Sequence, residues 1–315
     1  MNPWPAVWVV LGLALPVAAQ PTAPGPQLRA GVLTGDVRVD GVLDEAAWAA
    51  APAIDALTMS EPTAGGKPSA TTTVRVLADA HALVIGIVCF DREPSRIVSF
   101  TKQRDAALDA EDNVTIVLDT FMDGRSGYVF QVNPSGARYD ALINPGSSDA
   151  NSNWDGIWDA ATHRDAHGWS VEIWLPVQTI GFKHGLTQWH FNVQRRIQRL
   201  QETDRWASAR PDWSITQVSR AGLLTDLPEF SVGLGLTVRP AMVAGAGVPS
   251  AGAPAEGDLH PSLDAWQRLG PDVTASGSLN TDFAETEVDT RRTNFTRFPL
   301  FFPEKRTFFL EGASY

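Results

Sequence analysis

The sequence is nearly free of cysteine. Cys89 is the only one in 315 residues, so no disulfide can form within the chain, and a hydrophobic core must supply the stability. Cys89 lies in the apolar run ALVIGIVCF, which predicts a buried hydrophobic residue and not a nucleophile. The sequence also lacks a zinc-type His/Cys set, a nucleophile elbow and a phosphate-binding glycine loop.

Basic residues are outnumbered by acidic ones. The chain has 25 Lys and Arg against 36 Asp and Glu, which gives a net charge of -11. Nucleic acids and anionic membrane surfaces are bound through basic patches, so we expect neither as a partner. The acidic balance suits neutral or cationic ligands and metals that bind oxygen.

Long apolar runs are also absent. The run over residues 6–15 is too short to span a bilayer as a helix. It is followed by Pro16 and by small residues that end at Ala19, which is the pattern of a signal-peptide cleavage site. We therefore predict a signal peptide over residues 1–19 and an exported protein. The alternative is an anchor that is not cleaved.

Helical periodicity is rare, and short strands dominate. Only residues 43–52 predict a helix, with Asp44 as its N-cap and Pro52 as its end. Apolar or alternating runs separated by turn residues predict strands within residues 72–90, 113–136, 157–175 and 188–208. Many short strands with few helices predict an all-β chain folded as an antiparallel β-sandwich, which we place at residues 30–228.

The composition changes after the predicted sandwich. Residues 240–257 are rich in Ala, Gly and Pro and show no periodicity, which predicts a linker over 240–265. Alternation resumes in residues 266–315, which end in the phenylalanine-rich stretch FPLFFPEKRTFFLEGASY.

Tryptophan is unusually frequent, and seven of the eleven lie between Trp154 and Trp213. Indole rings stack on the apolar faces of sugars, while acids, amides and arginines hydrogen-bond to sugar hydroxyl groups. This mixture predicts a carbohydrate site. Its candidate residues are Trp154, Trp158, Glu172, Trp174, Arg196 and Trp206. The alternative for any one of these tryptophans is that it fills the space between two sheets.

Acidic residues in predicted turns suggest a metal site. Carboxylates at strand ends can supply the six to eight oxygens that calcium prefers, and the candidates are Asp40, Asp112 and Asp119. A set of solvated turn acids is the alternative.

Two enzymatic or cofactor functions remain as alternatives. A glycosidase needs two carboxylates on either side of the scissile bond, and Glu172 with Asp155 or Asp159 is a conceivable pair that no motif specifies. Haem binding needs axial ligands in a pocket, whereas Met59, Met122 and Met242 are scattered along the sequence. We therefore expect no catalytic residues.

Four blocks, found in order between residues 37 and 224, resemble a family 9 carbohydrate-binding domain. They are VRVDGVLDEAAW, VRVLADAHALVIGIVCFD, DNVTIVLDTFMDGRSGYVFQVNPSGARYD and NWDGIWDAATHRDAHGWSVEIWLP. The resemblance implies a jelly-roll β-sandwich that binds a glycan or polysaccharide and often contains structural calcium. Such domains are often attached to secreted glycoside hydrolases, which implies a link to carbohydrate catabolism.

A second resemblance concerns the C-terminal part of the chain. LNTDFAETEVDTRRTNFTRFPLFFPEKRTFFLEG resembles the segment that follows this domain in bacterial envelope proteins with an outer-membrane β-barrel. The likeness implies that residues 266–315 begin such a barrel, and that the protein resides in the periplasm or outer membrane. The alternative is a plug or docking domain of a transport or assembly barrel that binds no sugar.

Overall fold

The computed structural model describes residues 25–35, 37–145, 150–231, 236–247, 256–268 and 274–280. The predicted signal peptide and the phenylalanine-rich end of the chain lie outside these residues. Within them, no helix combines the length and apolar character needed to cross a membrane.

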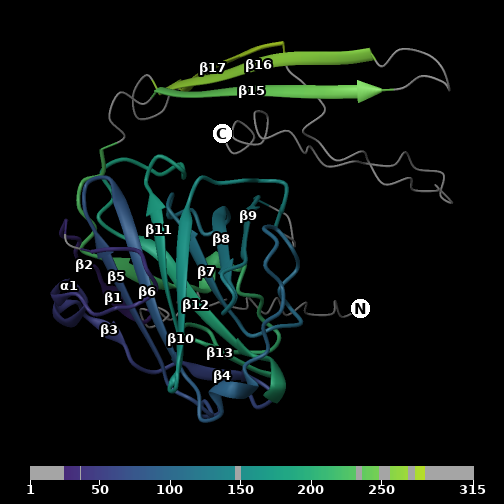
Figure 1. Cartoon of the computed structure of the whole chain (residues 1–315). Helices are drawn as coiled ribbons and strands as arrows, with labels where there is room; N and C mark the ends of the chain where they lie inside the picture. Colours follow the sequence, from purple (N-terminus) through teal and green to yellow (C-terminus); the bar gives the residue numbers. More distant parts are fainter. Residues whose placement is uncertain are drawn as a thin grey trace, which may run out of the picture.

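Two β-sheets form the main body of the chain (Figure 1). The eight-stranded sheet has the order β1-β14-β12-β7-β8-β9, with β13 paired to β12 and β4 paired to β13. Its strands are β1 (Gln27–Arg29), β4 (Thr58–Glu61), β7 (Asn113–Asp119), β8 (Gly127–Val132), β9 (Arg138–Ile143), β12 (Trp189–Ile197), β13 (Glu202–Arg205) and β14 (Gly222–Thr225).

The six-stranded sheet has the order β10-β11-β6-β5-β2, with β3 paired to β5. Its strands are β2 (Gly31–Val32), β3 (Ala53–Ile54), β5 (Thr72–Ala78), β6 (Ala82–Phe90), β10 (Asp159–Asp165) and β11 (Gly168–Pro176). Among the described pairs of these two sheets, only β1–β14 and β2–β5 are parallel. The expected antiparallel β-sandwich is confirmed.

Alternating side chains fill the space between the two sheets. In β7, Val114, Ile116 and Leu118 belong to the main hydrophobic core, as do Phe191 and Val193 of β12. The residues between them point away from the six-stranded sheet, to what we call the outer face of the eight-stranded sheet.

The single cysteine lies in this core, as predicted. Cys89 is fully buried on β6, and burial raises the pKa of its thiol to about 11. A thiol of this kind stays protonated at neutral pH.

Helical structure is short. The helices are α1 (Ala46–Ala50), η1 (Pro94–Arg96), η2 (Gln198–Leu200) and η3 (Val218–Arg220). The helix expected over residues 43–52 is only five residues long, and our prediction of Asp44 as its cap is wrong. Glu45 occupies the N-cap position and makes no side-chain capping bond. Trp48 is the buried residue of α1, so packing of its ring, and not capping, fixes this helix.

Residues 240–265, which we expected to form a linker, are largely strand. β15 (Leu236–Gly247) pairs with β16 (Glu256–Arg268), and β16 pairs with β17 (Thr274–Leu279) in a separate three-stranded sheet. Pairing uses backbone groups, so Ala, Gly and occasional Pro residues do not prevent it, although they remove the β-branched signal by which strands are recognised. The linker prediction is therefore wrong for most of this range.

Candidate functional site

Three of the four tryptophans predicted to bind sugar pack in or against the core. Trp154 and Trp158 are each only 3% exposed, and their rings pack against Phe130 with centroids 6.0 and 5.2 Å apart. Trp206 is partly buried against Phe191, at 5.8 Å. A sugar needs an open ring face, so for Trp154 and Trp158 the alternative of gap-filling residues is the correct one.

Glu172 is a structural residue. Its carboxylate is fully buried on β11 and accepts hydrogen bonds from Trp48 Nε1 and from the backbone N–H groups of Asp40 and Gly41, all at 2.9 Å. Burial raises the pKa of Glu172, and these three donors oppose the rise. The prediction that Glu172 contacts ligand is wrong, and the same contacts keep it from serving as a glycosidase acid with Asp155 or Asp159.

Trp174 and Arg196 remain accessible, but they belong to different sheets. Trp174 is 39% exposed on β11 of the six-stranded sheet. Arg196 lies on β12 of the eight-stranded sheet, where its guanidinium bonds to Gln198, Gln201 and Thr203. The six predicted residues are therefore not assembled into one site.

The three acids predicted to bind calcium each accept hydrogen bonds from the backbone. Asp119 accepts bonds from the N–H groups of Phe121 and Gly124 and from the His190 side chain, and Asp112 accepts one from the Gln198 N–H group. Asp40 accepts one from the Val42 N–H group within its own turn. Among the described residues, no group of three or more His, Cys, Asp or Glu is close enough to hold a metal ion.

A continuous row of polar side chains crosses the outer face of the eight-stranded sheet. The strand register places Gln194 of β12 opposite both Arg205 of β13 and Thr115 of β7. Thr115 lies opposite Gln131 of β8, and Gln131 lies opposite Tyr139 of β9. Residues in register share one face, so these five side chains line up across five strands. We call this set the polar row.

The centre of the polar row is held by hydrogen bonds. Arg205 donates from Nε and Nη2 to Gln194 Oε1 at 3.1 and 2.6 Å, and from Nη1 to the carbonyl of Trp213 at 2.6 Å. Because Oε1 of Gln194 accepts from Nε and Nη2 of Arg205, the side-chain NH2 group of Gln194 remains as a donor for a ligand. Burial lowers the pKa of Arg205, and the nearby Glu61 carboxylate opposes this.

The other end of the row offers neutral groups. Gln131 and Tyr139 are partly exposed, and the side-chain amide of Gln131 makes no hydrogen bond to any described residue. Burial and the charge of Asp109 raise the pKa of the Tyr139 hydroxyl, and a hydrogen bond with Ser152 opposes this, so the hydroxyl stays protonated. One of its two hydrogen-bonding roles is used by Ser152, and the other remains for a ligand.

An aromatic ring lies next to the row. Trp213 is partly exposed, and two guanidinium groups lie over its ring, with Arg220 Cζ at 3.9 Å and Arg210 Cζ at 4.8 Å from the ring centroid. Stacking of this kind holds both partners in a fixed orientation. Together with the bond from Arg205 to its carbonyl, it fixes Trp213 beside the polar row.

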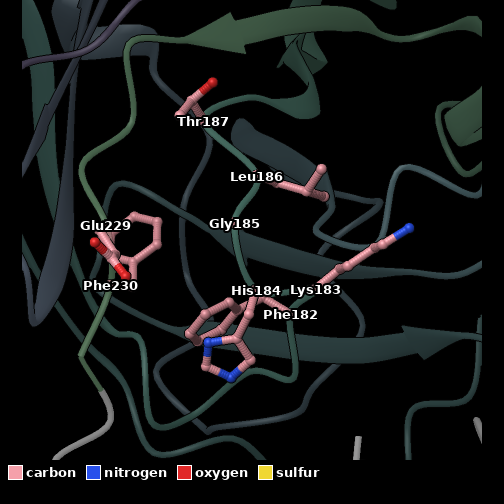
Figure 2. Close-up of a pocket in the computed structure, with 8 residues that line it drawn as sticks. All are labelled: Phe182, Lys183, His184, Gly185, Leu186, Thr187, Glu229 and Phe230. Atoms are coloured by element: carbon pink, nitrogen blue, oxygen red, sulfur yellow. The ribbon is translucent and has the colours of Figure 1, made fainter. Parts of the chain in front are cut away.

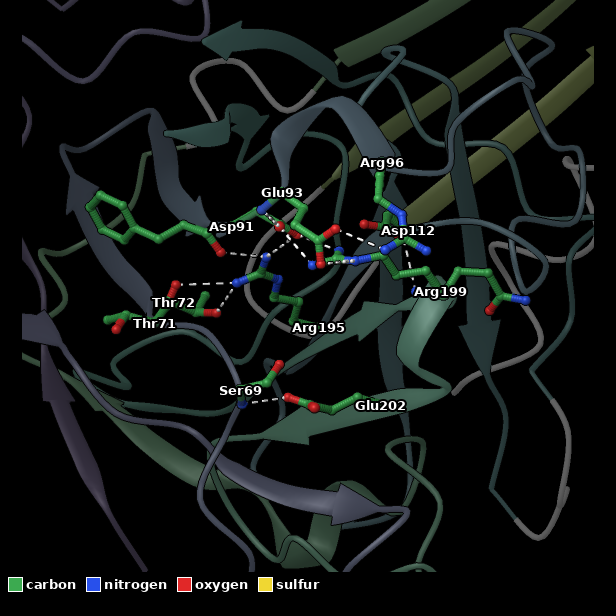
Figure 3. A network of polar contacts seen from close by, with 12 residues as sticks. Ser69, Thr71, Thr72, Asp91, Glu93, Arg96, Asp112, Arg195, Arg199 and Glu202 are labelled. Carbon is green, nitrogen blue, oxygen red and sulfur yellow. Dashed lines mark hydrogen bonds and ion pairs between the residues drawn. The ribbon is translucent and has the colours of Figure 1, made fainter. Parts of the chain in front are cut away.

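The opposite, inner face of β12 carries a buried charge network (Figure 3). Arg195 is fully buried and donates to Thr71 O, Thr72 Oγ1 and Phe90 O at the end of the six-stranded sheet. Arg199 makes a two-pronged ion pair with Asp91, at 2.7 and 2.8 Å. These contacts tie the two sheets together, and we assign the network to the fold and not to a ligand.

A small pocket lies away from the polar row, in segments 182–187 and 229–230 (Figure 2). Phe182 and Phe230 form its aromatic part, with Lys183, His184 and Glu229 exposed around it. Its volume of about 240 Å³ is below the roughly 300 Å³ at which small-molecule sites begin. We therefore place the candidate site at the polar row.

Sequence reasoning missed all five members of the polar row and predicted only their neighbour Arg196. Each strand contributes one outward polar residue, which looks like any solvated position until the strand register is known. The Gln194–Arg196–Arg205–Trp213 succession contained the available signal, since it groups an amide, arginines and an indole within twenty residues.

Neither a protein-family model nor a curated protein sequence matches the chain. Among solved structures, a Bacteroides uniformis protein thought to bind carbohydrate has a TM-score of 0.52 and 10% identity, over 64% of this chain and 99% of its own. A family 9 carbohydrate-binding module from Caldicellulosiruptor kristjanssonii, in complex with cellotriose, has a TM-score of 0.44 and 14% identity, over 66% and 96% of the two chains. The complex with glucose gives 0.43 and 14%, over 66% and 98%. The first of these similarities establishes the β-sandwich fold.

Proposed function

We propose that this chain binds carbohydrate at the polar row, without acting on it as an enzyme. The main support is the alignment of polar side chains across five strands, of which Gln194, Gln131 and Tyr139 are partly exposed and Thr115 and Arg205 are buried beneath them. Trp213 lies beside this row. Sugar hydroxyl groups need both donors and acceptors at such spacing. The structural likeness to a protein thought to bind carbohydrate supports the same proposal.

Calorimetric titration of the full chain with a panel of soluble oligosaccharides tests this proposal. We expect Gln194→Ala to weaken binding at least tenfold, because it removes both the amide donors and the acceptor that orients Arg205. Gln178→Ala is the matched control, since Gln178 is exposed outside the row. A folded protein that binds no oligosaccharide of the panel would refute the proposal.

A second proposal concerns location: we infer that the protein is exported and that the sheet β15–β17 contacts a lipid bilayer. One face of this sheet is apolar and exposed. It carries Leu236, Val238, Met242, Leu259, Leu263 and Leu279, each 40 to 70% exposed. The other face holds Asp264, Ser278 and Trp266.

Strand length supports contact with lipid. β15 and β16 have 12 and 13 residues, and a tilted strand needs about 9–11 residues to cross a bilayer. Apolar residues that alternate with polar ones are typical of strands with one face in lipid. An apolar face of this extent is otherwise rare on a monomer.

Flotation with phospholipid vesicles tests the second proposal. We expect the full chain to float with the vesicles, and Val238→Arg with Leu263→Arg to prevent it. Ser262→Arg with Ser276→Arg, which places the same charges on the opposite face, is the control. Equal flotation of both double variants would contradict lipid contact, and a concentration-dependent dimer without flotation would point to a second copy of the chain.

A further inference from the structure

The end of the polar row that carries Arg205 is basic, although the chain as a whole is acidic. Arg196, Arg205, Arg210 and Arg220 lie on or beside this end. The carboxylates near it are Glu61 and Asp212, whereas Asp109, Asp140 and Asp105 lie near Tyr139 at the other end. At the arginine end, four cations against two anions contrast with the net charge of -11 of the whole sequence. The preference for neutral or cationic ligands that we expected from composition does not hold at this place.

Arg205 is the most buried of these charges and makes no ion pair with a described residue. Its side chain belongs to a residue only 6% exposed, and no carboxylate among the described residues lies within 4 Å of it. Its acceptors are neutral, namely the Gln194 amide oxygen and the carbonyls of Trp213 and Ser208. The charge of Glu61 also acts on Arg205, but Glu61 pairs with Arg196 at 3.5 Å, so Arg205 has no ion-pair partner of its own within the described part of the chain. Such a buried charge is costly. An anion from a ligand would offset this cost.

Arg220 presents a free guanidinium beside Arg205. Its ring partner Trp213 is the residue whose carbonyl accepts the bond from Arg205. The Arg220 side chain makes no hydrogen bond or ion pair with a described residue, although its charge helps to lower the pKa of Asp212, after the larger effect of Arg210. A guanidinium that is stacked on an indole and has unused donors is oriented for two parallel bonds to a carboxylate.

We infer that the carbohydrate bound at the polar row is acidic, and that the carboxylate of a uronic acid residue binds to Arg220 in the field of Arg205. This inference rests on the proposed function of the row and narrows its ligand class. The remaining Gln194 and Gln131 groups would bond to the hydroxyl groups of the same glycan. A planar carboxylate fits the guanidinium fork better than a hydroxyl group, so the acid gains affinity over the neutral sugar.

The test uses trimers of galacturonic, glucuronic and mannuronic acid, each paired with its carboxyl-reduced form, in calorimetric titrations of the full chain. We expect at least one acidic trimer to bind ten times more tightly than its reduced form. Arg220→Gln should abolish that difference. Arg164→Gln, an exposed arginine on β10 of the other sheet, is the control and should change neither.

The outcomes separate the inference from the proposed function. If the reduced trimers bind as tightly as the acids, the acidic ligand is wrong and carbohydrate binding stands. If the acids bind more tightly but Arg220→Gln keeps the full difference, the assignment of the carboxylate to Arg220 is wrong. If no acidic or neutral sugar binds to the folded protein, both the inference and the proposed function fail.

Discussion

At the scale of single residues, buried polar side chains hold this sandwich together. Arg195 connects the inner face of β12 to the six-stranded sheet, and Glu172 connects β11 to the layer that contains Trp48. Both residues occupy positions where alternation alone would suggest an apolar core residue or a ligand contact. Their contacts are made by groups from segments more than 100 residues away.

Replacing Arg195 with leucine should destabilise the protein severely. The change removes the positive charge that faces the buried carboxylates of Asp91, Asp112 and Asp204. Loss of one partner from a buried ionic set costs about 3–5 kcal/mol of unfolding free energy. Urea denaturation measures the loss. Arg164→Leu on the exposed face of β10 should cost less than about 0.5 kcal/mol, and a similar small cost for Arg195→Leu would show that the network contributes little.

Glu172→Gln should lower stability without altering ligand binding. The amide nitrogen of glutamine cannot accept the N–H groups of Trp48, Asp40 and Gly41, so one or more buried donors lose their partner. An unsatisfied buried donor costs about 1–3 kcal/mol. Thermal unfolding and sugar titration of the same sample check both parts. A loss of affinity at unchanged stability would restore Glu172 to the ligand site.

At the scale of elements, the two sheets offer two different surfaces to a ligand. The eight-stranded sheet presents the polar row and Trp213, whereas the six-stranded sheet presents the lone exposed indole of Trp174. The second surface lacks a comparable alignment of amides and arginines within the described residues. Stacking without hydrogen bonds gives little discrimination among sugars, so we assign the ligand to the eight-stranded sheet.

Trp174→Ala separates the two surfaces. We expect this change to alter sugar affinity by less than about twofold, because Trp174 lies on the other sheet, away from the polar row. The change should also have little effect on the free energy of unfolding, since Trp174 is partly exposed. Calorimetric titration against the best oligosaccharide measures the effect beside Gln194→Ala. A tenfold loss with Trp174→Ala alone would place the ligand on the six-stranded sheet, with Trp174 as the sugar contact that the sequence predicted.

How much the sequence predicts differs between these elements. Hairpins such as β5–β6 and β7–β8 have clear alternation and turn residues, so they and the β-sandwich could be predicted. The polar row could not, because it depends on the register of five strands that span residues 115–205. Trp154 and Trp158 were wrongly assigned, since an indole in a β-rich sequence has the same local pattern whether it faces the core or a sugar. The pairing of β15 with β16 could not be predicted, because the Ala and Gly residues of these strands give no alternating apolar pattern.

At the scale of the whole molecule, buried acids make stability depend on pH. Burial and the neighbouring Glu202 raise the pKa of Asp204 to about 7, against the attraction of Arg195, and burial raises that of Asp140 to about 6. In the unfolded chain these acids titrate near 3.8. The folded state therefore holds more protons between about pH 4 and pH 7, and stability falls as the pH rises through this window. The lowered pKa values of Asp91 and Glu111 act in the opposite direction, and their stabilisation is lost as the pH falls below their unfolded-state values of 3.8 and 4.5.

The protein should be more stable at pH 5 than at pH 8 by about 2–4 kcal/mol, since each pKa unit is worth about 1.4 kcal/mol. Urea midpoints measured at pH 5, 6, 7 and 8 show the slope. Asp204→Asn should flatten it, because an amide carries no charge at any of these pH values, while the exposed Asp44→Asn should keep the wild-type slope. A wild-type curve that rises from pH 5 to pH 8 would show that Asp204 is ionised in the folded protein.

The isolation of Cys89 has a practical consequence for all of these experiments. A thiol that is sealed in the core and protonated at neutral pH does not react with maleimide or iodoacetamide reagents while the protein is folded. A single cysteine introduced at an exposed position, such as Ser219 next to Arg220 or Ser276 on β17, would then be the only site of labelling. Spin labels or fluorophores can be attached at chosen points to follow glycan or vesicle binding, with the native cysteine left in place.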